Sequence, residues 1–217
     1  SALAWSAGPV GGPIRIGEID PLTGKLAKHG IEIHEGIVFA VEQANAAGGI
    51  GGRQVELVSR DDQSQPEVAI NQAEDLLYGS RVVALVGGYV DSLVGPVGEL
   101  AQRHRIPYVA SASLQRTLTR GRTNPYFFRV SLLGGIVEPL CGFLRDLLRP
   151  RKVALLFTAT PGSTEFAGEV KQCLEGSNIE IVLFDKFRPG SPGFSSILAK
   201  IRRTEPELVI SGGFFPD

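Results

Sequence analysis

The sequence alternates short apolar runs with longer stretches in which apolar residues recur at helical spacing. Expected strands lie at 14–19, 54–59, 81–87, 106–111, 152–157, 179–184 and 207–211. Expected helices lie at 31–46, 66–78, 92–103, 135–148, 164–174 and 194–203. Three strands are continuously apolar, which indicates burial on both faces and therefore a parallel sheet covered by helices on both sides. The connections between such strands are right-handed, so the pattern predicts a doubly wound α/β fold.

A pause in this alternation divides the chain into two layers of the same kind. We expect residues 14–117 to form the N-terminal part of lobe 1 and residues 132–217 to form part of lobe 2. Residues 118–131 are expected to be the crossover between the lobes. Residues 1–13 are small, uncharged and interrupted by Gly and Pro, so we expect a flexible segment. This segment fits the tail of a cleaved export signal and a terminus of vector residues equally well.

Composition excludes several classes of protein. Hydrophobic residues make up 43% and charged residues 21%, as in ordinary globular chains. The net charge is −1, which leaves no global basic field to hold nucleic acid or an anionic membrane. No apolar run reaches the length of about 18–20 residues that a membrane-spanning helix needs. The two cysteines, Cys141 and Cys173, are expected to be free, half-buried thiols, unless the fold brings them together.

Motifs for cofactor binding and catalysis are missing. The GGIGG run at 48–52 ends a helix instead of opening one, so it does not suit a dinucleotide. His29 and His34 are five residues apart, and no cluster of ligands completes a metal site. Asp61 and Asp62 end a strand, where a turn that caps the following segment is favoured over a cation site. We therefore expect no cofactor, no metal and no enzymatic activity.

Several motifs occur together in order and at consistent spacing. They are Pro21-Leu22-Thr23-Gly24, Asn45–Arg53, Val55–Val58, Asp61-Asp62 with Pro66, Val86-Gly87, Ile106-Pro107 and Phe128-Arg129. This set resembles the periplasmic binding protein type I family, as found in ABC transporters for branched-chain amino acids and amides. The resemblance covers almost the whole chain, although residues 132–217 match by pattern only. It implies two hinged lobes that close on a small solute, an ABC permease as partner and a periplasmic location.

In open α/β sheets, ligands bind beyond the carboxyl ends of the strands. The loops at those ends, together with the resemblance, imply a set of ligand-binding residues. The N-terminus of the helix near Ser92 is suited to a carboxylate, and strand-end carbonyls near Ala112 are suited to an ammonium or amide. The full set is His29, Tyr89, Asp91, Ser92, Ser111, Ala112, Ser113 and Phe214.

Several of these positions depart from the amino acid binding pattern of the family. Asp91 stands where the family usually has a Ser that binds the ligand carboxylate, and such a ligand would be repelled. Either Asp91 turns away and Ser92 serves, or the ligand presents a cation or an amide; Asp91 as a helix cap is a further alternative. Tyr89 and the serines fit ordinary loop packing equally well. The other departures are Leu114 for a frequent Thr, Pro161-Gly162 for an aromatic, and His29 for an aromatic wall that Phe214 could supply instead.

Three functions follow as hypotheses. The first is an exported solute-binding protein of an ABC importer that captures a small amino acid-like or amide solute. The second is a ligand-sensing domain of the same fold in a regulator or signalling receptor. The third is a doubly wound enzyme, against which the missing motifs argue.

The length of 217 residues is short for the family, whose chain crosses between the lobes three times. The chain also begins at Ser1 and contains no Met, so we expect neither terminus to be a natural gene boundary. A single crossing would leave both lobes without their later segments, which exposes sheet edges and apolar faces. We expect a missing C-terminal segment, a partner chain or self-association to cover these surfaces.

Overall fold

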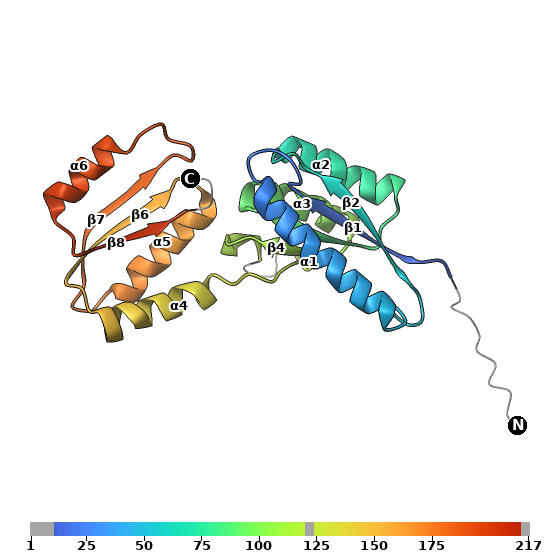
Figure 1. The fold of residues 1–217 in the computed structure, drawn as a ribbon, viewed down its shortest axis with the longest axis horizontal. Coiled ribbons are helices and arrows are strands. Elements are labelled where there is room, and N and C mark those ends of the chain that lie inside the picture. Colours follow the sequence, from blue (N-terminus) through green and yellow to red (C-terminus); the bar gives the residue numbers. More distant parts are fainter. Residues whose placement is uncertain (1–10, 120–123, 214–217) are drawn as a thin grey trace, which may run out of the picture. The chain divides into compact units, whose positions relative to one another are not determined.

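The computed structural model describes residues 11–119 and 124–213, and the chain separates into two compact units (Figure 1). The first unit contains residues 1–113 and 118–130, and the second contains 114–117 and 131–217. The segment expected as a crossover, 118–131, therefore groups largely with the first unit. The reason is a short strand, β5 (Phe127–Arg129), which pairs in parallel with the preceding strand. Most of the segment expected to be flexible, 1–13, lies outside the described residues.

The first unit contains a five-stranded parallel sheet in the order β2-β1-β3-β4-β5. Its strands are β1 (Ile14–Asp20), β2 (Val55–Asp61), β3 (Ala84–Tyr89), β4 (Tyr108–Ala112) and β5. Its helices are α1 (Ala27–Ala46), α2 (Pro66–Glu74), a π-helical turn (Asp75–Gly79) and α3 (Asp91–His104). A 3₁₀ turn (Arg116–Leu118) is divided between the units, with Leu118 in the first and the other two residues in the second. The predicted α/β fold with parallel sheets is confirmed, and element bounds shift by a few residues.

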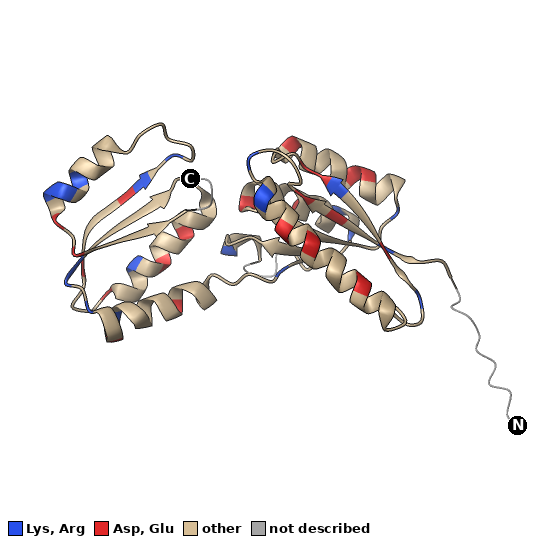
Figure 2. Ribbon diagram, viewed as in Figure 1, with Lys and Arg blue, Asp and Glu red and all other residues tan. Residues whose placement is uncertain are grey.

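Helices cover both faces of this sheet. α2 and α3 pack on one face, where the core includes Ile19, Leu76, Leu85 and Val97. Of the residues of α1, only Gly30 is buried, and an apolar hollow of about 260 Å³ lies between this helix and the sheet. α1 contains the exposed acidic residues Glu32, Glu35 and Glu42, and the ribbon of this helix has red segments in Figure 2.

The second unit contains a three-stranded parallel sheet in the order β7-β6-β8. The strands are β6 (Lys152–Thr158), β7 (Glu180–Phe187) and β8 (Leu208–Gly212). The helices are α4 (Gly134–Gly142), continued by a π-helical turn (Phe143–Leu148), α5 (Pro161–Leu174) and α6 (Ser195–Thr204). The buried core joins α4 and α5 to the sheet, whereas α6 has no buried residue.

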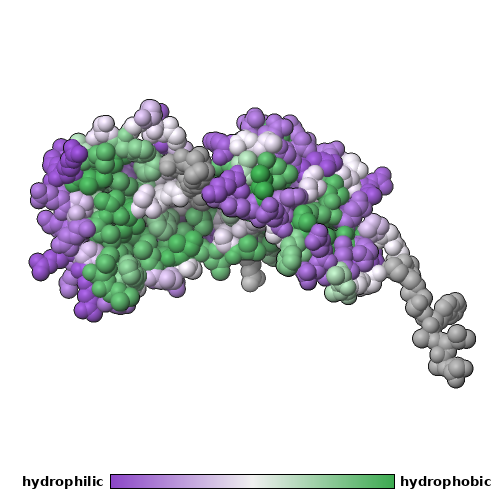
Figure 3. All heavy atoms as spheres, in the orientation of Figure 1, coloured by the Kyte–Doolittle hydropathy of each residue, from purple (hydrophilic) through white to green (hydrophobic). Residues whose placement is uncertain are grey.

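Part of the second unit presents apolar side chains on its surface. Phe184 of β7, Leu198 of α6 and Val209 of β8 are each more than two-fifths exposed. Figure 3 shows a hydrophobic band across this part of the molecule. Solvent contact of this kind on a small sheet is consistent with the expectation that the lobes leave apolar faces uncovered.

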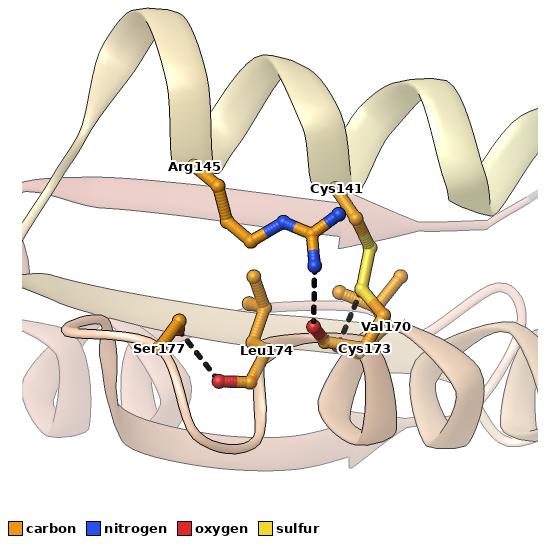
Figure 4. The surroundings of a disulfide bond; sticks show 6 residues. All are labelled: Cys141, Arg145, Val170, Cys173, Leu174 and Ser177. Carbon is orange, nitrogen blue, oxygen red and sulfur yellow. Dashed lines mark hydrogen bonds between the residues drawn. A yellow bond between two sulfur atoms is a disulfide. The ribbon is translucent and has the colours of Figure 1, made fainter.

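A disulfide joins Cys141 of α4 to Cys173 of α5, so the prediction of free thiols is wrong (Figure 4). The two helices pack against each other over the same core. The Cα atoms of the two cysteines lie 6.4 Å apart, within the range for a disulfide. The guanidinium of Arg145 donates a hydrogen bond to the Cys173 carbonyl beside it. Contact between the two helices depends on their packing, which the spacing of two cysteines along the chain does not reveal.

Candidate functional site

The carboxyl ends of the parallel strands meet at one edge of the first sheet, and most of the expected ligand-binding residues lie there. Tyr89 ends β3 and pairs with Ala112, which ends β4. Val90, which follows Tyr89, donates its N–H to the Ala112 carbonyl at 2.9 Å. Asp91 then begins α3, so two strand ends and one helix start come together. Topology thus confirms that these residues share an edge; their contact with a ligand stays a prediction.

Asp91 and Ser113 form the polar centre of this edge. The Ser113 hydroxyl donates a hydrogen bond to the Asp91 carboxylate at 2.7 Å, and both residues are buried. Asp91 does not cap α3, because Val90 occupies the cap position and no side chain caps this helix. The capping alternative for Asp91 is therefore wrong, and its carboxylate is directed toward the end of β4.

A guanidinium that sequence reasoning missed lies beside this pair. Arg129 is the last residue of β5, and its Nη1 donates a hydrogen bond to the Ser113 carbonyl at 3.2 Å. β5 comprises three residues, too few to show a hydrophobic period. The aromatic run before Arg129 is the sequence signal that could have indicated this strand.

Two aromatic rings come together at the same end of β3. The rings of His29 and Tyr89 stand 4.8 Å apart between centroids with an interplanar angle of 31°. The Nδ1 of His29 also lies 3.1 Å from a carboxylate oxygen of Glu32, one turn along α1. Gly30, next to His29, lets this turn of α1 approach the Pro21 backbone closely. This arrangement brings a residue of α1 to the end of β3.

The other expected residues belong neither to the Asp91–Ser113 pair nor to the two rings. Ser92 is exposed in the first turn of α3, and Ser111 is half-buried on β4. Leu114 packs against the core of the second unit. Phe214 lies outside the described residues. The second unit has a polar pair of its own that sequence reasoning missed, because the Thr158 hydroxyl donates a buried hydrogen bond to the Ser163 hydroxyl where β6 leads into α5.

Asp61 and Asp62 serve a turn, as the sequence favoured. Asp61 accepts hydrogen bonds from the Thr23 hydroxyl at 2.6 Å and the Gln63 N–H at 2.8 Å. Burial acts to raise the pKa of Asp61, but these hydrogen bonds outweigh it and lower the pKa below its usual value. Asp62 accepts a hydrogen bond from the Ser64 N–H at 2.8 Å.

Across residues 11–119 and 124–213, no group of three or more His, Cys, Asp or Glu side chains is arranged to hold a metal ion.

None of the helices in residues 11–119 and 124–213 combines the length and the apolar character required to span a bilayer.

Comparisons with known proteins identify related sequences. Residues 13–217 match the family model described as periplasmic binding protein. The leucine-, isoleucine-, valine-, threonine- and alanine-binding protein of Pseudomonas aeruginosa is 26% identical over 205 residues, covering 94% of this chain and 54% of that protein. Leu/Ile/Val-binding protein homolog 2 of Brucella abortus is 28% identical over 227 residues, covering 100% of this chain and 58% of its own length.

A solved structure agrees with the fold. The branched-chain amino acid transporter substrate-binding protein of Streptococcus pneumoniae, in complex with isoleucine, superimposes with a TM-score of 0.82 at 26% identity. The match covers 93% of this chain and 57% of that one. The chain thus spans about half the length of the relatives it matches. These relatives are binding proteins and not enzymes.

Proposed function

The chain belongs to the periplasmic binding protein family, and from this premise we propose that it serves an ABC importer as a solute-binding protein. The proposed solute is small and amino acid-like, or an amide. The observation that carries this proposal is the buried Asp91–Ser113 pair beside the His29–Tyr89 rings at one sheet edge. The names of the relatives, which bind amino acids, support the same class of ligand.

Each part of the edge has a distinct role in this proposal. The Asp91 carboxylate accepts hydrogen bonds from an ammonium or amide N–H of the solute, and Ser113 fixes the orientation of that carboxylate. The His29 and Tyr89 rings provide an aromatic wall for the side chain of the solute. Ser92, exposed in the first turn of α3, offers a hydroxyl and a backbone N–H to a carboxylate of the same solute. Ligand sites of this kind combine an apolar lining with a few placed polar groups.

We also propose that the protein is exported and acts in the periplasm with an ABC permease. The disulfide between Cys141 and Cys173 supports this location, because disulfides form and persist in oxidising compartments such as the periplasm. Family membership supports it independently. An intact-mass measurement of protein exported from cells, with and without reductant, tests whether the bond is present there.

Calorimetric titration against a panel of amino acids, amides and urea tests the function directly. We expect at least one amino acid or amide to bind, without turnover. Native mass spectrometry of the purified protein adds an independent measurement, since a co-purified solute would appear as extra mass. Failure of every panel member to bind, or conversion of any of them to product, would contradict the proposal.

Asp91→Ala is expected to change the affinity for the best panel ligand at least roughly tenfold, about 1.4 kcal/mol. The physical reason is that the substitution removes the carboxylate that receives the solute N–H and leaves Ser113 without this acceptor. Glu99→Ala is the matched control, because Glu99 is an exposed carboxylate of the same helix. Equal binding by wild type and Asp91→Ala across the panel would remove Asp91 from the site.

A further inference from the structure

A buried carboxyl group lies behind the candidate site. Asp20 ends β1, its side chain is fully buried, and its Oδ1 accepts a hydrogen bond from the Gly88 N–H at 2.8 Å. Its second oxygen, Oδ2, is also buried, and a side-chain hydrogen bond with Glu18 is among the causes that raise the pKa of this carboxyl. Gly88 is followed directly by Tyr89. The carboxyl group of Asp20 is therefore hydrogen-bonded to the backbone next to Tyr89, whose ring belongs to the candidate site.

The turn from β3 to α3 has an unusual backbone. Gly87, Gly88 and Val90 have φ values of 97°, 92° and 65°. A positive φ is uncommon for a residue with a side chain and rare for a β-branched one such as Val90. Strained conformations of this kind persist only where their surroundings hold them. Here they aim Tyr89 and Asp91 toward the candidate site.

Three hydrogen bonds from neighbouring strands hold this turn. Asp20 accepts from the Gly88 N–H, the Tyr108 hydroxyl donates to the Gly87 carbonyl at 3.2 Å, and the Val90 N–H donates to the Ala112 carbonyl at 2.9 Å. The Asp20 carboxyl also fills the space beside the turn, since a Cβ on Gly87 would lie 2.5 Å from Asp20 Oδ2. A change in the position of Asp20 is thus transmitted to the turn without intervening side chains.

The surroundings of Asp20 are acidic. Burial raises the pKa of Asp20 to about 9 despite the hydrogen bond from Gly88, and the neighbouring carboxyls of Glu18 and Asp62 raise it further. Glu18 on β1 accepts hydrogen bonds from His34 of α1 and from Ser59 of β2.

The other groups facing Asp20 add no positive charge. Burial raises the pKa of Asp62, just after β2, to about 6. Burial also raises the pKa of Tyr108 on β4, and the charge of Asp20 adds to this effect. None of the groups that shift the pKa of Asp20 is a cation. At neutral pH this carboxyl is accordingly neutral.

We propose that Asp20, with its proton on Oδ2, is a positioning residue that holds the β3–α3 turn and makes solute capture sensitive to alkaline pH. A neutral carboxyl can accept the Gly88 N–H without burying a charge. Its ionisation would place an uncompensated carboxylate beside Glu18 and Asp62, and the turn would shift. Tyr89 would then move relative to His29, and Asp91 relative to Ser113. This inference rests on the proposed function for its binding readout but not for its protonation and stability readouts.

The pH dependence of stability has a definite sign. The unfolded chain releases the Asp20 proton near pH 4, whereas the folded chain keeps it to about pH 9. Between these values the folded state binds more protons, so stability falls as the pH rises and levels off above about pH 9. Release of this one proton lowers the folding equilibrium constant by at most about tenfold for each pH unit.

Asp20→Asn tests the proposal, because its amide oxygen still accepts the Gly88 N–H but no proton is released. Unfolding by urea and calorimetric affinity for the best panel ligand are measured from pH 6 to 10. We expect wild type to lose roughly tenfold more affinity than Asp20→Asn over this range, with a steeper fall in stability above pH 7. Asp146→Asn is the control and should follow wild type, since Asp146 is an exposed carboxyl of the second unit and is not among the groups that shift the pKa of Asp20. Ionisation of the ligand itself affects all variants alike.

A ¹³C titration of the Asp20 carboxyl in wild type completes the experiment and does not depend on ligand binding or on a folded variant. A neutral carboxyl at pH 7 supports the inference, and a carboxylate at pH 7 overturns it. Identical pH profiles of affinity for wild type and Asp20→Asn would also overturn it. Failure of every panel ligand would contradict the proposed function alone, while the carboxyl titration and the unfolding series would still decide the protonation state.

Discussion

Replacement of both Cys141 and Cys173 by alanine is expected to lower the free energy of unfolding by about 3–4 kcal/mol. The two residues are separated by 32 positions, and a covalent link of that span removes many conformations from the unfolded chain. Alanine suits both sites because Cys141 is buried and a small apolar side chain leaves no unsatisfied polar group. Unfolding by urea at neutral pH, followed by circular dichroism, measures the difference.

Reductant provides the control for this loss. Added to wild type, it should produce a decrease of similar size, and added to the double alanine variant it should have no effect. The expected loss belongs to the second unit, since α4 and α5 both contribute to its core. A wild-type protein that unfolds at the same urea concentration with and without reductant, and whose mass shows two free thiols, would contradict the assignment.

The fold followed from the sequence because its strongest signals are local. Continuously apolar runs such as β6 could be recognised without knowledge of their neighbours, and Pro66 and Gly48 gave helix ends at or near the observed positions. β5 was missed because a three-residue strand is defined by its partner β4 and not by a period of its own. Residues 118–130 group with the first unit, and the pairing of β5 with β4 lies within them.

The candidate site was predictable only as a neighbourhood. Parallel strands place their carboxyl ends together, so Tyr89 and Ala112 could be expected at one edge. The pairing of Asp91 with Ser113 depends on strand register and on the turn at Val90, which local patterns do not encode. Local patterns therefore do not exclude Asp91 as a helix cap.

Asp20 belongs to a pattern that the sequence shows locally. On β1, every second residue lies on the same face of the sheet, and Ile14, Ile16 and Glu18 share one face. An acidic residue therefore stands where an apolar one is expected. Asp20 continues that series at the carboxyl end of the strand. Acidic residues in a central strand that is buried on both faces indicate a polar cluster in the interior, because a buried charge requires compensation or protonation.

Gly30→Ala is expected to destabilise the protein by about 2–3 kcal/mol and to weaken solute binding. A Cβ at Gly30 would overlap the backbone carbonyl of Pro21, and its next contact, with the Pro21 Cγ, would be at 2.9 Å. Because backbone atoms cannot rotate away as a side chain can, the first turn of α1 must move. His29 is the preceding residue, so its ring would leave its place 4.8 Å from that of Tyr89.

Gly36→Ala on the same helix separates this steric effect from the effect of alanine on helix formation. Gly36 is exposed in the interior of α1, and a Cβ there would meet no atom within 4 Å. Alanine at an open helical position stabilises by about 0.5–1 kcal/mol relative to glycine, so this variant should unfold at a higher urea concentration than wild type. Opposite signs for the two substitutions would show that close approach to Pro21 fixes the start of α1. A Gly30→Ala protein as stable as Gly36→Ala, with unchanged solute affinity, would contradict the placement of His29 against Tyr89.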